Sequence, residues 1–159
     1  MATTNFPNGL SVENGAHLSA DASIAVKTSS AFAGGTTNAH GDSAGTGNPY
    51  NLFTVTGVVE LRIFGVCSVE LTGASATLEV GVAGATANLI AQTTGTNIDA
   101  NEIWNSATPG TRVMAVSGSF WVADATIIET VGTADVTAGQ ITYYCVWRPI
   151  SDGATVVAA

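Results

Sequence analysis

The sequence has little charge of either sign, and positive charge is especially scarce. Only 10% of its 159 residues are charged, against about 25% in an average soluble protein. Four basic residues face twelve acidic ones, which gives a formal net charge of −8. A nucleic-acid-binding protein needs a cluster of basic side chains, and Lys27, Arg62, Arg112 and Arg148 are too few and too scattered to form one. Nucleic acid is therefore not expected as a partner.

Long apolar runs are also missing, and we expect no secretory leader. No stretch approaches the roughly 18 consecutive apolar residues that a membrane-spanning helix needs, and residues 1–10 contain neither a basic region nor an apolar run. Apolar residues nevertheless make up 46% of the chain, which is too many for a disordered protein. We expect a soluble protein that is made in a cytoplasm and has no membrane partner.

Residues that bind metals and cofactors are few. His17 and His40 are the only histidines, and Cys67 and Cys145 are the only cysteines. The chain has no Cys-x-x-Cys pair, no His-x-His pair, no calcium loop and no glycine-rich loop that leads into a helix. We predict no metal site and no cofactor. Both cysteines fall on apolar registers, which favours buried free thiols, with a disulfide between them as the alternative.

Two groups of residues could suggest catalysis. Ser43 lies in a Gly-Asp-Ser-Ala-Gly string, but a nucleophile elbow needs a strand before the serine, a helix after it and a later histidine. No histidine follows Ser43. A carboxylate pair, either Glu60 with Glu70 or Asp99 with Glu102, is the other candidate for hydrolysis, and a solvated strand surface is the interpretation we prefer. We predict no catalytic residue and therefore no enzyme.

From residue 51 onward, apolar and β-branched segments alternate with turns. Between Val55 and Leu71, apolar or small residues occupy every second position, which is typical of a strand with one dry face, or of two strands kinked near Gly65. Further strand patterns follow at roughly ten-residue spacing. We predict an all-β fold for residues 51–159, an antiparallel β-sandwich or jelly-roll-like barrel of about 8 strands. The late aromatic residues are interpreted as core and sheet-surface packing, with a carbohydrate platform as the alternative.

Residues 1–50 lack this regular pattern. A glycine-rich stretch at 34–49 has no periodicity and is interpreted as a linker, and residues 22–28 resemble a short strand. We predict an extended, irregular N-terminal arm that docks onto a neighbouring subunit. Its candidate contact residues are apolar: Phe6, Leu10, Ile24, Val26 and Phe32. Three apolar exceptions on the polar face of the long strand are candidates for contacts between copies of the chain: Val58, Phe64 and Val66.

Two short segments resemble known virion proteins. The opening Thr-Asn-Phe-Pro-Asn-Gly-Leu of residues 4–10 resembles the first residues of small structural proteins of tailed bacteriophages. The ending Tyr-Cys-Val-Trp-Arg-Pro-Ile-Ser-Asp-Gly of residues 144–153 resembles a Trp-Arg-Pro-Leu-Ser/Thr-x-Gly tail of phage virion proteins. On these segments the chain is similar to capsid decoration proteins, also called cement proteins.

The resemblance implies a function without catalysis. Proteins of this family typically form homotrimers on the outside of the phage head and clamp neighbouring major capsid subunits. The partners implied are the major capsid protein and other copies of the chain, and the implied location is the virion exterior after synthesis in the host cytoplasm. The net charge of −8 agrees with a position away from packaged DNA. A head-fibre, tail-fibre or receptor-binding β module of a phage virion is the alternative.

Overall fold

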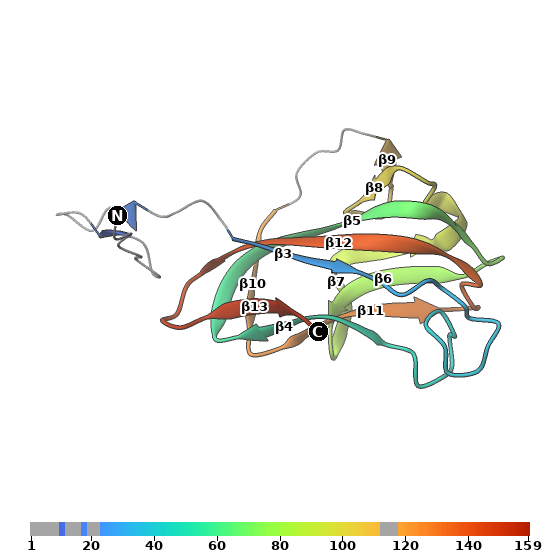
Figure 1. Cartoon of the computed structure of the whole chain (residues 1–159), viewed down its shortest axis with the longest axis horizontal. Helices are drawn as coiled ribbons and strands as arrows, with labels where there is room; N and C mark the ends of the chain where they lie inside the picture. The colour runs from blue at the N-terminus through green and yellow to red at the C-terminus, as the bar shows by residue number, and fades with distance from the viewer. Residues whose placement is uncertain (1–9, 12–16, 19–22, 112–117) are drawn as a thin grey trace, which may run out of the picture.

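The protein is a sandwich of two antiparallel β-sheets, which confirms the predicted all-β fold (Figure 1). The computed structural model describes residues 10–11, 17–18, 23–111 and 118–159. In this part of the chain no helix has the length and apolarity needed to cross a bilayer. A single 3-10 turn, η1 (Gly95–Asn97), interrupts the strands of the described residues.

The first sheet, sheet I, has six strands in the described residues. Its main path runs β3-β12-β5-β8-β9. Strand β10 pairs with the first residues of β5, on the same edge that β8 occupies further along. The long pair at its centre, β5 and β12, is joined from Val59 opposite Pro149 to Thr72 opposite Ala138. The strand bounds are β3 Ser23–Thr28, β5 Val58–Thr72, β8 Glu102–Trp104, β9 Gly110–Thr111, β10 Phe120–Ala123 and β12 Ala138–Pro149.

The second sheet, sheet II, has five strands in the order β13-β4-β11-β6-β7. Its bounds are β4 Tyr50–Thr56, β6 Thr77–Val82, β7 Ala85–Thr94, β11 Thr126–Gly132 and β13 Thr155–Ala158. A separate antiparallel pair joins β1 (Leu10–Ser11) to β2 (His17–Leu18). The core lies between the two sheets, where alternate side chains of both are fully buried, among them Leu61, Ile63, Phe53 and Ile127.

The sandwich does not close into a barrel. In the described residues no strand ladder connects sheet I to sheet II. At the edge where β3 approaches β13, the link is made by a side chain, because Lys27 Nζ donates to the carbonyl oxygen of Ala159. Of the two predicted alternatives, the sandwich is therefore confirmed, and the jelly-roll-like barrel is wrong because the two sheets do not join into a closed barrel.

The sandwich begins well before residue 51. β3 pairs with β12 along its whole length, and the following loop, residues 29–49, covers one end of the two sheets (Figure 1). We call this segment the capping loop. Its Phe32 is only 3% exposed within the core. The predicted boundary at residue 50 is therefore displaced, because the segment from Ser23 onward packs against partners more than a hundred residues away that its own local pattern does not reveal.

The long apolar alternation of residues 55–71 belongs to two strands. The chain turns at Gly57, where φ is +68° and a Cβ atom would lie 2.7 Å from Ser151 Oγ; the expected kink near Gly65 is not where the strands separate. A register shift near Gln140 then moves Val69 off the dry face, leaving it 53% exposed. Both departures come from cross-strand geometry, which the period of a single segment does not contain.

Candidate protein-binding face

The strand alternation of β5 gives sheet I an apolar inward face and an outward face on which apolar side chains stand among charged ones. From Val59 to Cys67, every second residue points into the core and is buried. The residues of the other register point outward, and they include Val58, Phe64 and Val66 beside the charged Glu60 and Arg62. A strand that faces water on one side normally carries polar residues there. The three apolar side chains are therefore the exceptions on a mixed outward side of β5.

The pairing register extends these residues into rows that cross the sheet. Phe64 lies opposite Tyr144 of β12, which lies opposite Val26 of β3. The rings of Phe64 and Tyr144 stack with centroids 5.1 Å apart. In the next row, Val146 lies between Arg62 and Ile24. The outward side chains of three strands thus form one continuous surface.

Several of these side chains are widely exposed. Trp121 is 77% exposed, Ile24 62% and Val26 48%. Trp121 of β10 is the cross-strand partner of Glu60, so it lies on the same outward side. We define the sheet I face as the outward apolar residues of these strands: Ile24, Val26, Val58, Phe64, Val66, Ile103, Trp121, Tyr144 and Val146.

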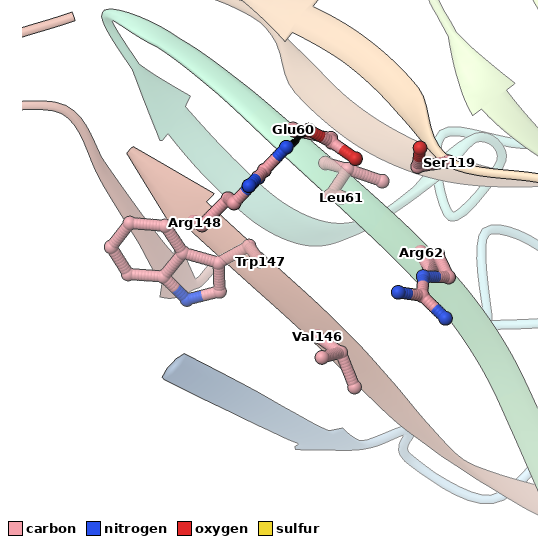
Figure 2. Close-up of a pocket in the computed structure, with 7 residues that line it drawn as sticks. All are labelled: Glu60, Leu61, Arg62, Ser119, Val146, Trp147 and Arg148. Carbon is pink, nitrogen blue, oxygen red and sulfur yellow. Dashed lines mark hydrogen bonds and ion pairs between the residues drawn. The ribbon is translucent and has the colours of Figure 1, made fainter. Parts of the chain in front are cut away.

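A shallow depression lies beside this face, with a volume of about 240 Å³ (Figure 2). In it, Arg148 donates to Oε2 of Glu60 through Nε at 2.8 Å and also through Nη2. A hydrogen bond from Ser119 and the Arg148 guanidinium lower the pKa of Glu60. Arg62 adds a second guanidinium on the exposed side of β5 (Figure 2). The depression therefore carries two positive charges and one negative charge, in a chain whose net charge is −8.

The structure brings five of the eight predicted contact residues together. Ile24 and Val26, predicted for the arm, and the three trimer candidates of β5 all belong to the sheet I face. Phe32 does not, because its ring is packed in the core and stacks on His40 at 4.1 Å. Phe6 lies outside the described residues, and Leu10 falls in β1 with no side-chain placement described.

Other members of the face are not predicted as contact residues by the sequence. Trp121 and Tyr144 are among the late aromatic residues, which the strand pattern places only in general terms in core or sheet-surface packing. A signal for Tyr144 was present, because Ile141, Tyr143 and Cys145 already occupy the dry register of β12. Trp121 carries no such signal, since β10 has only four residues.

A second cluster of polar residues lies inside the sandwich. Glu129 of β11 and Tyr143 of β12 are fully buried, and His40 of the capping loop is 8% exposed. His40 Nε2 lies 2.8 Å from Glu129 Oε1, and the Tyr143 hydroxyl donates to Glu129 Oε2. The cluster joins both sheets to the capping loop and is closed to a substrate.

The residues considered for catalysis have local structural contacts. Ser43 Oγ donates to Asp135 Oδ1 at 2.7 Å, which ties the capping loop to the turn before β12. Glu60 and Glu70 lie ten positions apart on β5, or about 30 Å at strand spacing. That is far more than the 5–9.5 Å or so between the carboxylates of a glycosidase. Glu102 Oε2 accepts the backbone N–H of Asp99 at 3.1 Å and closes a turn.

The two cysteines are free and buried, as expected from their registers. On the β5–β12 ladder, Cys67 faces Ile141 and Cys145 faces Ile63, so four residues of strand separate them, too far for a disulfide. Burial raises the pKa of Cys67 to about 11 and that of Cys145 to about 12. Both thiols therefore act as small apolar core residues at neutral pH.

In the part of the chain that the structure describes, no three histidine, cysteine or carboxylate side chains gather in a way that could hold a metal ion. Comparison with known proteins finds no matching family model, no matching curated protein and no matching solved structure.

Proposed function

We propose that this protein is a decoration subunit of a tailed-bacteriophage head, which binds the outside of the capsid and stabilises contacts between major capsid subunits. The sheet I face carries the proposal. The phage-like opening and ending of the sequence support this class of particle, and the face supports the means of binding that we propose.

The face has the composition of a protein-binding surface. Soluble monomers rarely expose large contiguous apolar patches, and residues that dominate binding energy are enriched in tryptophan, tyrosine and arginine. Trp121, Tyr144 and Arg62 all lie on or beside the face. A partner that covers it would remove the exposed 77% of Trp121 from water.

We assign two partners to two parts of the face. The β5 part, with Val58, Phe64 and Val66, packs against another copy of the chain in a homotrimer. The β3 edge, with Ile24 and Val26, contacts the major capsid protein. Copies with a charge of −8 repel one another, and this repulsion is weakest where the surface is apolar and carries two arginines against one glutamate.

The proposed position explains why no reactive group is needed. Packaged DNA pushes the shell outward, and a subunit that bridges two capsid proteins adds contact area across the seam between them. The acidic chain disfavours contact with DNA, which agrees with an exterior position. We expect residues 1–22 to contribute to the capsid contact as well.

The experiment uses heads that lack the protein and purified protein added back. A face variant, Val26→Asp with Phe64→Asp, is compared with a control variant of the same charge on the outward side of sheet II, Thr54→Asp with Thr155→Asp, two positions that are exposed. We expect the face variant to lose binding in co-sedimentation and to leave heads sensitive to heat, while the control binds as wild type. Equal binding by both variants would contradict the proposed face.

Two further measurements separate the alternatives. Copy number per virion distinguishes a decoration protein, present at every capsomer, from a fibre or receptor-binding module, present at few sites. Deletion of residues 1–22 tests the arm and leaves every described strand of sheets I and II in place. A deletion to residue 47 would also remove β3 and Phe32 of the core, so loss of binding there would report unfolding.

A further inference from the structure

His40 lies at the point where the capping loop meets the sandwich. Its ring is packed between Phe32 and Tyr50, with both centroid distances at 4.1 Å. The partner of its Nε2, Glu129, is a fully buried carboxyl between two β-sheets. A buried carboxyl is costly unless it is neutralised or fully hydrogen-bonded. The protonation of this pair therefore bears directly on how the loop is held.

Both imidazole nitrogens of His40 face oxygen atoms. Nδ1 lies 2.9 Å from the carbonyl oxygen of Ser30, and Nε2 lies 2.8 Å from Oε1 of Glu129. A carbonyl can only accept, so Nδ1 carries a proton. The second contact then needs a proton of its own, either on Nε2 or on the carboxyl group. A neutral imidazole beside an ionised carboxylate supplies only one of the two protons.

Tyr143 does not provide the missing proton. Its hydroxyl already donates to Oε2 of Glu129. Burial, followed by the nearby charge of Glu129, raises the pKa of Tyr143 well above its ordinary value, so the hydroxyl stays a donor at neutral and mildly alkaline pH. The proton between His40 and Glu129 must therefore come from solvent.

The neighbouring ionisable groups do not change this count near neutral pH. Burial raises the pKa of Cys67 to about 11, and backbone hydrogen bonds, first from Ala44, lower the pKa of Asp42. Asp135 accepts from Ser43, and Lys27 lies 5.4 Å from the centre of the Tyr50 ring. The titratable groups on the elements that adjoin the pair are Lys27 of β3, Tyr50 of β4, Cys67 of β5, Tyr143 of β12, and Asp42 and Asp135 at the capping loop.

We propose that His40, Glu129 and Tyr143 form a proton-dependent lock that holds the capping loop on the sandwich and releases it as the pH rises. In an unfolded chain, a glutamate carboxyl loses its proton above about pH 4.3 and an imidazole above about pH 6.5. The folded lock keeps one proton in the Nε2···Oε1 contact. Folding above about pH 6.5 therefore takes up one proton, and the folding equilibrium constant falls about tenfold per pH unit until the lock itself loses that proton.

The substitution Glu129→Gln separates this lock from an ordinary buried contact. A glutamine amide can donate to Nε2 of a neutral His40 while its carbonyl accepts from Tyr143. All three hydrogen bonds are then made without an extra proton. The variant should fold with a flat stability profile over the range in which the wild type loses stability.

The test is urea unfolding of the full chain at several pH values, with hydrogen exchange of the capping-loop amides in parallel. Between pH 6.5 and 8.5 we expect the wild-type folding constant to fall by up to about a hundredfold and the capping loop to lose protection first. Glu129→Gln should show neither change. The control Glu79→Gln alters an exposed carboxylate of sheet II that accepts from Gln92, and should follow the wild-type profile.

Two outcomes would overturn the lock. The first is the same pH slope for wild type and Glu129→Gln. The second is a wild-type profile that is flat from pH 6.5 to 8.5. If Glu129→Gln does not fold, His40→Gln replaces it, because a glutamine amide donates to Glu129 without titrating, and the same flat profile is expected. An unchanged slope in that variant would also overturn the proposal.

Discussion

The outward faces of the two sheets differ although their inward faces are equally apolar. Sheet I carries apolar and aromatic side chains outward, and the Phe64–Tyr144–Val26 row crosses three strands. Sheet II carries a mostly polar outward surface in which Thr54 lies opposite Thr126. Sheet II thus presents a mostly polar surface to water, whereas sheet I presents a group of apolar and aromatic side chains among its charged ones.

Local hydrogen bonds reinforce the difference. On sheet II, Gln92 donates to Glu79 at 3.0 Å across neighbouring strands, so its polar groups find partners within the sheet. The apolar side chains of the sheet I face gain most by leaving water, and only a second molecule can cover them fully. This contrast in composition is why sheet I, rather than sheet II, is the candidate binding surface.

The largest expected effect is a difference in the free energy of unfolding between variants of two tryptophans, one on the inward and one on the outward side of sheet I. Trp104 is fully buried, donates to Thr93 Oγ1 at 2.9 Å and lies edge-on to Tyr143. Trp104→Ala should lower the free energy of unfolding by about 3–5 kcal/mol, whereas Trp121→Ala should change it by no more than about 0.5 kcal/mol. Urea unfolding measures both. A large loss for Trp121→Ala would mean that this exposed ring is part of the fold rather than of a binding surface.

A smaller effect separates the two parts of the sheet I face. Phe64→Ser should weaken self-association by about 2 kcal/mol, or about 30-fold in Kd, as for a central aromatic contact. Sedimentation equilibrium gives this value. Val26→Ser should instead weaken binding to heads and leave self-association nearly unchanged, and Thr130→Ser on sheet II should change neither.

The reverse pattern would exchange the partners that we propose for the two parts of the sheet I face. If Val26→Ser dissociates the oligomer and Phe64→Ser leaves it intact, the β3 edge is the contact between copies and β5 faces the capsid. If neither variant affects either measurement, the apolar character of the face has no part in binding.

The sequence predicts this contrast well where strands are long and poorly where contacts are distant. In β5 the exceptions Val58, Phe64 and Val66 could be recognised because six buried residues at alternating positions establish the inward register around them. The capping loop has no periodicity, yet it is ordered, because Asp42 accepts three backbone N–H groups and His40 reaches a carboxyl 89 positions away. Such contacts depend on which strands become neighbours, and no local pattern contains that information.

The smallest effect concerns the ion pair beside the sheet I face. The pKa of Glu60 is lowered first by the Ser119 hydroxyl and then by Arg148, so this carboxylate stabilises the folded protein above the pKa of an unfolded glutamate, about 4.3. That contribution is lost as the pH falls through the lowered pKa. Urea unfolding between pH 6 and 3 should show a slightly shallower acid loss for Glu60→Gln than for wild type. Arg148→Gln should flatten the profile less, because the hydrogen bond from Ser119 remains. An effect of Arg148→Gln that exceeds that of Glu60→Gln would show that the arginine stabilises the edge of the face by something other than the charge of Glu60.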